Sequence, residues 1–261
     1  MYHRKVYLNI GNSFMTAGYF TKGVFVPIKR VPSEISSFKK LTALNKKYCG
    51  LIIVASVVPK LEKAVKKIYK NRVLVMRNDN VPVVNCYKNK KTAGIDRLLI
   101  SLGAARKYGA PCLVVDFGTA TTINLVGKRG EFKGGLICPG ASLFSKYLFE
   151  NTSKLPYISL APVKKTVGRS TKDCIKAGVF YGYVEMVRGL ILRLRKETGG
   201  NIKVIAAGGW GKLFSPYIKE IAVYEPYLVF YGMEYTVEKN SKSETRNSKK
   251  TEKKNKIKKN N

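Results

Sequence analysis

The sequence contains almost none of the residues on which several common catalytic sites depend. Its 261 residues include a single histidine, His3, close to the N-terminus. A serine-histidine-acid triad, a paired-histidine zinc site and a histidine general base are therefore excluded. Any proton transfer has to use a carboxylate or a lysine instead.

Cysteine spacing argues against two further kinds of site. The cysteines are five in number, widely spaced and without a CxxC pair: Cys49, Cys86, Cys112, Cys138 and Cys174. Disulfide frameworks and zinc centres have characteristic spacings, and those spacings are missing here. We expect reduced thiols that lie among apolar neighbours in the core.

Long apolar runs are also missing. No run approaches the roughly 20 residues that span a bilayer. The apolar run at residues 6–10 is shorter than the roughly 7–15-residue core of a secretory signal. We therefore expect a cytoplasmic protein with no membrane segment, and its 45% of hydrophobic residues suffices for one large domain or two small ones.

Acidic residues are scarce, with 16 against 49 lysines and arginines, so the formal net charge is +33. From Lys239 onward the chain has ten basic and two acidic residues and almost nothing apolar, which predicts a disordered basic tail over residues 239–261. The remaining charge is dispersed. Nucleic-acid binding through the basic surface and tail is one interpretation. Solvated lysines are favoured, because the interleaved aromatic residues of single-strand binders are missing.

The two most familiar phosphate-binding motifs, GxxxxGK[ST] and GxGxxG, are absent as well. Instead, one pattern occurs twice, as VYLNIGNSFMT in residues 6–16 and as LVVDFGTATTINL in residues 113–125. In each copy a β-rich run leads to a polar residue, an apolar residue, a glycine and then small polar residues. The polar residues are Asn9 and Asp116.

This pattern is typical of a hairpin that binds phosphate. Glycine allows a tight turn to bring backbone N–H groups close to phosphate oxygens, and a hydroxyl such as that of Ser13 or Thr119 adds a donor. A carboxylate just before the turn can hold a cation. Either copy alone is more simply an ordinary glycine-turn hairpin, but the duplication favours a pair that clamps a nucleotide.

The order of predicted elements also repeats. In the first half we predict strands over residues 5–10, 14–20, 23–29, 51–55 and 72–76, and helices over 33–47 and 56–70. In the second half we predict strands over 112–117, 120–126, 132–137 and 203–207, and helices over 141–151, 170–198, 212–220 and 226–237. A cleft between two such α/β halves is the natural ligand site.

The long helix predicted over residues 170–198 has three features of its own. Ser170 is followed three residues later by Asp173, which is a capping signal. Gly178 and Gly182 would allow a neighbouring helix to approach closely. An apolar stripe runs at helical spacing through Ile175, Val179, Tyr183, Val187, Leu190, Ile191 and Leu194.

Between the two hairpins, the sequence YKNKKTAGIDR ends at the start of a predicted helix. Asp96 lies there beside Arg97, and we expect this carboxylate to stay ionised and to accept a proton from a substrate hydroxyl. Asp96 alone is more simply a helix cap. Together with two phosphate hairpins, the pair suggests a phosphoryl-acceptor site with an anion clamp.

The motifs NIGNS, GIDR, DFGTATT, GGLICPG, KLP and VGRST, followed by AGVFYGYVEMVRGL, resemble those of the type III pantothenate kinases. The resemblance covers residues 6 to about 238, in matching order and spacing. It implies an α/β fold of two repeated RNase H-like (actin-like ATPase) subdomains, residues 1–109 and 110–238, with mixed sheets flanked by helices and a cleft between them. It also implies transfer of the γ-phosphate of ATP to the 4′-hydroxyl of pantothenate, the first step of coenzyme A synthesis.

The same resemblance implies roles for individual residues. Asp96 would be the catalytic base, and Asp116 would hold a monovalent cation, K⁺ or NH₄⁺, while Mg²⁺ accompanies ATP. The pantothenate pocket would include Tyr87, Gly94, Ile95, Asp96, Arg97 and Thr171. The ATP site would include Asn9, Ile10, Gly11, Asn12, Ser13, Phe14, Met15, Thr16 and Thr119. Members of the family are homodimers, which implies a dimer interface on the glycine-faced helix and its apolar stripe.

One residue departs from the family pattern, because the family has aspartate where this chain has Asn9. The internal repeat also aligns Asn9 with Asp116. An amide removes a full negative charge from the metal site, which weakens Mg²⁺ binding. We favour an active kinase, because Asp96, Asp116 and Thr171 are intact. The alternatives are a catalytically impaired, nucleic-acid-associated binding protein and a kinase of the same superfamily with another small-molecule acceptor.

Overall fold

The computed structural model describes residues 5–45, 50–200 and 202–241, so His3, Cys49 and the predicted tail beyond residue 241 lie outside the described residues. The chain divides into two compact units that interleave along the sequence. Unit 1 comprises Met1–Val83, Ala93–Gly103 and Val229–Asn261, and unit 2 comprises Val84–Thr92 and Ala104–Leu228. The subdomain limits expected at residues 109 and 238, and the cleft expected between the halves, stay predictions.

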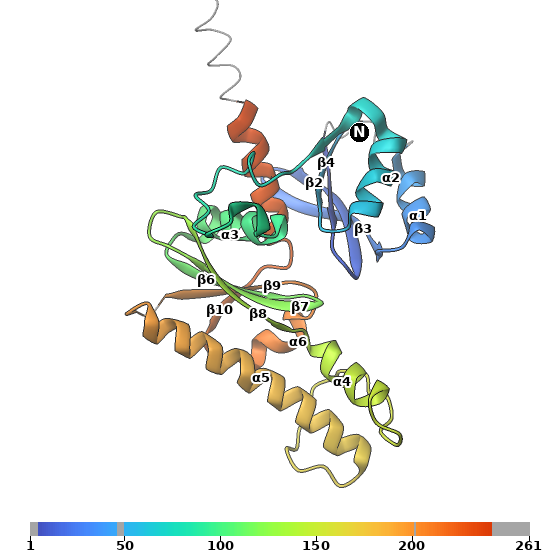
Figure 1. Cartoon of the computed structure of the whole chain (residues 1–261), viewed down its shortest axis with the longest axis vertical. Coiled ribbons are helices and arrows are strands. Elements are labelled where there is room, and N and C mark those ends of the chain that lie inside the picture. The colour runs from blue at the N-terminus through green and yellow to red at the C-terminus, as the bar shows by residue number, and fades with distance from the viewer. Residues whose placement is uncertain (1–4, 46–49, 201, 242–261) are drawn as a thin grey trace, which may run out of the picture. The chain divides into compact units, whose positions relative to one another are not determined.

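Unit 1 is built on a five-stranded mixed sheet in the order β3-β2-β1-β4-β5 (Figure 1). Its strands are β1 (Lys5–Ile10), β2 (Phe14–Thr21), β3 (Val24–Pro32), β4 (Leu51–Ser56) and β5 (Val73–Val75). β1 to β3 are antiparallel neighbours, whereas β4 and β5 run parallel to β1. The connecting helices are α1 (Ile35–Asn45) and α2 (Pro59–Tyr69).

Unit 2 repeats this plan, with the strand order β8-β7-β6-β9-β10. Its strands are β6 (Cys112–Phe117), β7 (Ala120–Val126), β8 (Phe132–Pro139), β9 (Lys203–Ala207) and β10 (Ile221–Tyr224). Each strand of unit 2 thus has a counterpart at the same place in the sheet of unit 1. The predicted internal repeat and the mixed-sheet α/β class are confirmed.

The prediction of one helix over residues 212–220 is wrong. Helix α6 (Gly211–Phe214) ends after about one turn, a 3₁₀ turn follows at Ser215–Tyr217, and the strand β10 then pairs with β9. Pro216 contributes to the break, because its nitrogen has no hydrogen to donate to the Lys212 carbonyl in a continuing α-helix. The unpredicted β10 completes the repeat.

Both faces of the sheet in unit 1 are covered. Leu8 packs into a core with α1 and α2, whereas its neighbour Tyr7 points to the opposite face, because successive strand residues alternate. On that opposite face the Tyr7 hydroxyl donates a hydrogen bond to Glu234 of the C-terminal helix, residues 228–241. Phe230 of the same helix stacks on Phe25 with ring centroids 3.9 Å apart. The C-terminal helix therefore completes the core of the unit that contains the N-terminal strands.

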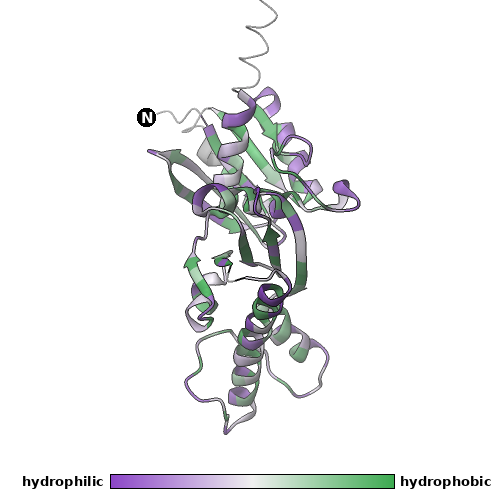
Figure 2. Cartoon of the chain, turned by 90° about the vertical axis from the view of Figure 1, so that its left-hand side faces the viewer, coloured by the Kyte–Doolittle hydropathy of each residue, from purple (hydrophilic) through white to green (hydrophobic). Residues whose placement is uncertain are grey.

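In unit 2 the long helix α5 (Thr171–Glu197) covers one face of the sheet. Most of its predicted stripe is buried there, with Tyr183, Val187 and Ile191 packed against β6. In Figure 2 the strands are mostly hydrophobic, while helices such as α5 alternate between hydrophobic and hydrophilic residues. Gly178 and Gly182 face away, because a Cβ added to either would meet nothing within 4 Å in the described part of the chain. The expected close helix packing at these glycines is not found there.

Four cysteines can be placed, and all four are free. Cys112 is buried, and burial raises the pKa of its thiol to about 12, as expected for an inert core residue. The prediction of core positions is wrong for Cys86 and Cys174, which are exposed, and Cys138 is partly exposed. Within the described residues, no helix is both long and apolar enough to cross a membrane.

Candidate active site

The residues of the predicted site are divided between the two units. Unit 1 carries the first hairpin, residues 9–16, together with Gly94, Ile95, Asp96 and Arg97. Unit 2 carries Tyr87, Asp116, Thr119 and Thr171. In each unit the hairpin belongs to the sheet, whereas Gly94 to Arg97 lie at the start of a helix and Thr171 begins α5.

The first hairpin is a tight turn between β1 and β2. The Gly11 N–H donates to the Phe14 carbonyl at 3.1 Å, and a Cβ at position 11 would approach that carbonyl to 3.3 Å. Ser33, which follows β3, donates from its hydroxyl to the Gly11 carbonyl at 2.6 Å, and its N–H donates to the Ser13 carbonyl at 3.0 Å. These hydrogen bonds fix the backbone of the turn, whose residues Asn12 and Ser13 are exposed. The role of Ser33 was missed, because no local pattern marks it.

The second hairpin connects β6 and β7 and is supported in a different way. The Gly140 N–H donates to the Thr119 carbonyl at 3.1 Å. A Cβ at Gly140 would lie 2.3 Å from that carbonyl oxygen, so only glycine fits. Gly140 is the last residue of the GGLICPG motif, whose purpose the sequence alone did not reveal.

Asn9 and Asp116 occupy equivalent places in the two sheets. Asn9 pairs with Thr16 on the antiparallel side and with Ala55 on the parallel side. Asp116 pairs with Thr122 and Ala207 on the corresponding sides. The sequence alignment of the two hairpins is therefore confirmed, and Asn9 is an amide where the repeat has a carboxylate.

The Asp116 carboxylate lies in a space that glycine leaves open. Gly208 has φ +82°, and a Cβ there would lie 2.3 Å from Asp116 Oδ1 and 2.7 Å from the Phe117 carbonyl oxygen. Tyr224 fixes this glycine by donating from its hydroxyl to the Gly208 carbonyl at 3.0 Å. Carboxylate and carbonyl oxygens close together suit a hard cation. Among the described residues, no group of three or more His, Cys, Asp or Glu side chains could hold a metal ion.

A buried hydroxyl pair lies behind the second hairpin. The hydroxyls of Thr121 in β7 and Tyr183 in α5 are 2.6 Å apart, and both residues are 0% exposed. Burial raises the pKa of Tyr183 well above its usual value, and the hydrogen bond to Thr121 opposes this. The pair ties the hairpin to α5. The sequence predicted Tyr183 only as a member of an apolar stripe. It gave no sign of the hydrogen bond between Tyr183 and Thr121.

Asp96 lies in the first turn of α3 (Ile95–Tyr108). Its Oδ1 accepts a hydrogen bond from the Arg97 N–H at 2.8 Å, and a Cβ at Gly94 would lie 2.5 Å from the same oxygen. Burial raises the pKa of Asp96, and the backbone and positive charge of Arg97 only partly oppose this. The expectation that Asp96 stays ionised rested on the helix N-terminus and on Arg97, whereas burial is the largest influence on its pKa. A raised pKa makes a carboxylate a stronger proton acceptor.

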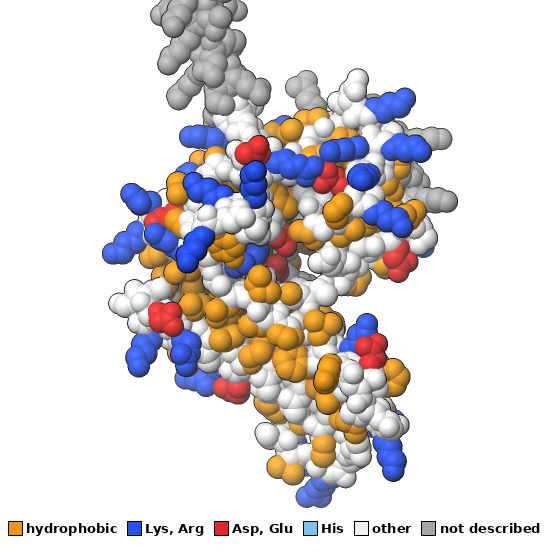
Figure 3. All heavy atoms as spheres, in the orientation of Figure 1, with side chains coloured by type: hydrophobic (Ala, Val, Ile, Leu, Met, Phe, Trp, Pro, Cys, Tyr) orange, Lys and Arg blue, Asp and Glu red, His pale blue; other side chains and the backbone are white. Residues whose placement is uncertain are grey.

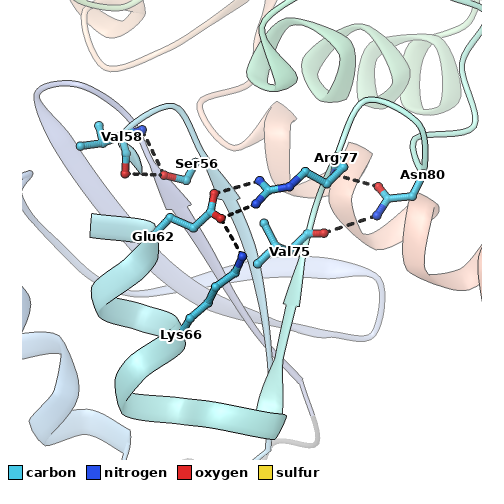
Figure 4. A network of polar contacts seen from close by, with 7 residues as sticks. All are labelled: Ser56, Val58, Glu62, Lys66, Val75, Arg77 and Asn80. Carbon is cyan, nitrogen blue, oxygen red and sulfur yellow. Dashed lines mark hydrogen bonds and ion pairs between the residues drawn. The ribbon is translucent and has the colours of Figure 1, made fainter. Parts of the chain in front are cut away.

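The chain that leads to α3 is fixed by a polar network (Figure 4). Arg77 forms a two-pronged pair with Glu62 of α2, with one bond of 2.9 Å, and Lys66 lies 3.1 Å from the same carboxylate. The hydrogen bond from Arg77 is the largest of the influences that lower the pKa of Glu62. Farther along, the Asn78 amide donates to the Ala93 carbonyl at 2.8 Å, one residue before Gly94. The start of α3 is therefore positioned by contacts that the sequence did not indicate.

Thr171 is the first residue of α5, and its surroundings are apolar. The predicted cap is confirmed, because Ser170 Oγ accepts from the Asp173 N–H at 3.2 Å. Thr171 lines a groove of about 900 Å³ between α4 (Ala141–Glu150) and α5, together with Leu143, Tyr147, Ile175 and Gly178. Figure 3 shows hydrophobic side chains gathered over α4.

Comparison with known proteins agrees with this geometry. The family profile described as type III pantothenate kinase matches residues 5–193. A type III pantothenate kinase of Persephonella marina is 31% identical over 242 residues, which cover 87% of this chain and 95% of that protein.

Two solved structures show the same fold at low identity. A Campylobacter jejuni protein described as a candidate Baf family transcriptional activator aligns with a TM-score of 0.62 at 19% identity, over 91% of this chain and 99% of that one. The archaeal actin homolog Ta0583 aligns with a TM-score of 0.52 at 11% identity, over 90% and 99% of the two chains. The repeated actin-like sheets, the two glycine hairpins and the match of the profile over most of the sequence lead to one conclusion: the chain belongs to the type III pantothenate kinase family.

Proposed function

We propose that this protein phosphorylates pantothenate with ATP, and that Asp96 is the base. Asp96 accepts the proton of the 4′-hydroxyl as that oxygen bonds to the γ-phosphorus, and the bond from the γ-phosphorus to the β-γ bridging oxygen breaks to release ADP. The observation that carries this proposal is the half-buried carboxylate at the start of α3, whose pKa burial raises, in a chain of the pantothenate kinase family. Arg97 would hold the pantothenate carboxylate, and Tyr87 and Thr171 would complete the pocket.

The two hairpins would hold the phosphates of ATP. The turn within residues 9–16 would donate hydrogen bonds from its backbone N–H groups. Thr119 would donate from its hydroxyl and its N–H in the second hairpin. Mg²⁺ would be held mainly by ATP, with the Asn9 amide oxygen as a neutral ligand. Bound Mg²⁺ supplies charge neutralisation at the phosphates.

Asp116 would hold a monovalent cation, K⁺ or NH₄⁺. Gly208→Ala tests this role, because the new methyl group would displace the Asp116 carboxylate. We expect a several-fold rise in the K⁺ concentration that gives half-maximal activity. Gly199→Ala is the matched control, since Gly199 also has a positive φ of +70° but open space around it. Equal K⁺ requirements in both variants would contradict the assignment.

The groove between α4 and α5 is the surface that we propose for a homodimer. Most of the expected stripe is buried in the unit itself, and only its first members, Ile175 and Val179, also line the groove. Tyr147, another lining residue, is 66% exposed. Tyr147→Lys should produce monomers by light scattering. Leu192→Lys, an exposed position of α5 that does not line the groove, should leave the dimer intact.

The kinase assignment is tested by following pantothenate-dependent ADP formation and the mass of the product. Wild type should form phosphopantothenate, and Asp96→Asn should form it about 10²- to 10⁴-fold more slowly. Asp79→Asn, an exposed aspartate of the same unit, should retain full activity. Wild-type ADP formation that does not depend on pantothenate would reject the substrate. The nucleic-acid-associated alternative is not favoured, and the cytoplasmic location stays a prediction.

A further inference from the structure

The two adjacent glycines of the GGLICPG motif, Gly134 and Gly135 in β8, have different surroundings. Both have positive φ, +108° and +147°. A Cβ at Gly135 would lie 1.9 Å from the Ile123 carbonyl oxygen, so Gly135 is needed for pairing with β7. A Cβ at Gly134 would instead lie 3.1 Å from Cε1 and 3.7 Å from Cδ1 of Tyr87. Gly134 therefore lies directly against a side chain of the proposed pantothenate pocket.

The backbone before Tyr87 is attached to the same strand. Phe132, at the start of β8, donates from its N–H to the Val84 carbonyl at 2.9 Å, and its carbonyl accepts from the Cys86 N–H at 2.9 Å. The rings of Tyr87 and Phe132 also pack at a centroid distance of 5.2 Å. Residues 84–87 thus run along the edge of β8 and bring the Tyr87 ring over the glycine.

Asn85 holds the other side of this loop. Its side chain is buried, with the residue only 9% exposed, and its Oδ1 accepts from the Tyr87 N–H at 3.1 Å. Its Nδ2 donates to the Lys90 carbonyl at 3.1 Å. One amide therefore satisfies two backbone groups on either side of the turn, and this fixes the backbone from which the Tyr87 ring projects.

We propose that Gly134 and Asn85 are positioning residues that fix the Tyr87 ring in the orientation that binds pantothenate. The inference rests on the proposed function, in which Tyr87 contacts that substrate. An aromatic side chain that is already held in place loses little conformational entropy on binding. Displacing it should weaken pantothenate binding and leave the nucleotide site unchanged.

Gly134→Ala is the direct test. Its methyl group requires the ring to shift by about a few tenths of an ångström, so we expect the KM for pantothenate to rise about tenfold, with the KM for ATP nearly unchanged. Gly130→Ala is the matched control, because Gly130 also has a positive φ, +79°, but its added Cβ would only touch Ala105 at 3.8 Å. This control also introduces a side chain at a positive φ, but without the contact to Tyr87, and its KM for pantothenate should stay near that of wild type.

The same substitution in a Tyr87→Ala background separates the possible outcomes. If Gly134 acts through the ring, Gly134→Ala should add little to the effect of Tyr87→Ala. Full additivity would overturn the inference while leaving the proposed pocket intact. If Tyr87→Ala alone leaves the KM for pantothenate unchanged, the assignment of Tyr87 under the proposed function fails, and the inference fails with it.

Substitutions of Asn85 keep the inference testable if Gly134→Ala folds poorly. Asn85→Ala removes both hydrogen bonds and should raise the KM for pantothenate. Asn85→Asp keeps the acceptor for the Tyr87 N–H and should restore part of the affinity. A KM that is equally high in both variants, or unchanged in both, would contradict a positioning role for the bond to Tyr87.

Discussion

Replacing Asp96 by asparagine should reduce activity and increase stability in the same protein. The amide is nearly isosteric, and its Oδ1 can still accept the Arg97 N–H that lies 2.8 Å from the carboxylate oxygen. The variant therefore removes the negative charge and the basicity with little change in packing. A positioned base contributes about 10²- to 10⁴-fold to the rate, so kcat should fall by that factor, which corresponds to about 3–5 kcal/mol.

The stability change follows from the direction of the pKa shift. Burial raises the pKa of Asp96 in the folded state, so folding disfavours its charged form. The stabilising contribution of the protonated carboxyl is present below the unfolded pKa, and it is lost as pH rises through the folded pKa. Asparagine stays neutral at every pH. Asp96→Asn should therefore unfold at a higher temperature than wild type near neutral pH, and this advantage should shrink as the pH falls toward the ordinary value for aspartate.

Two measurements on the same samples test this reasoning. Thermal melts across a pH series give the stability difference, and steady-state assays over the same series should show an acidic limb in the kcat/KM of the wild type above the ordinary pKa of aspartate. Asp79→Asn is the control, since this exposed carboxylate should change neither quantity. A loss of activity smaller than about tenfold would refute the base assignment. A lower melting temperature of Asp96→Asn near neutral pH would refute burial as the dominant influence.

Three other substitutions have definite expected results. Asn9→Asp restores the carboxylate at the register position equivalent to Asp116, and it should lower the Mg²⁺ concentration that gives half-maximal activity; an unchanged Mg²⁺ titration would contradict this. Tyr183→Phe and Thr121→Val should each cost about 1–3 kcal/mol in urea unfolding, while the double variant should cost less than their sum, because neither hydroxyl is then left buried without its partner. The pairing with Arg77 lowers the pKa of Glu62, so its stabilising contribution is present above the ordinary pKa of glutamate and lost as pH falls through the lowered value. Glu62→Gln should accordingly lower the melting temperature near neutral pH and have a smaller effect in acid, and a pH-independent difference would count against the pairing.

The two hairpins and the repeated strand order could be predicted from the sequence because their signals are local. Glycine and polar residues at fixed spacing determine a turn wherever the chain places it, and Asn9 and Asp116 occupy the same register. The strand β10 was missed because its four residues carry too little periodicity to compete with a neighbouring helix signal.

The contacts that hold the site residues could not be predicted, because they join residues far apart in the sequence. Thr121 and Tyr183 are 62 residues apart, and Glu62 and Arg77 are 15 residues apart on different elements. The pKa of Asp96 could not be predicted from the sequence for the same reason. Arg97 is visible as its neighbour in the sequence, whereas the burial that outweighs it arises only from tertiary packing.

The helix over residues 228–241 covers strands that are synthesised long before it. Strands β1 to β3 leave the ribosome well before the partners of Tyr7 and Phe25, because Glu234 follows Tyr7 by 227 residues and Phe230 lies in the same helix. At about 5–20 residues per second, strands β1 to β3 wait on the order of ten seconds or more for this helix. During that interval one face of their sheet is uncovered, so a nascent chain paused before residue 228 should recruit chaperones through the region around Tyr7 and Phe25.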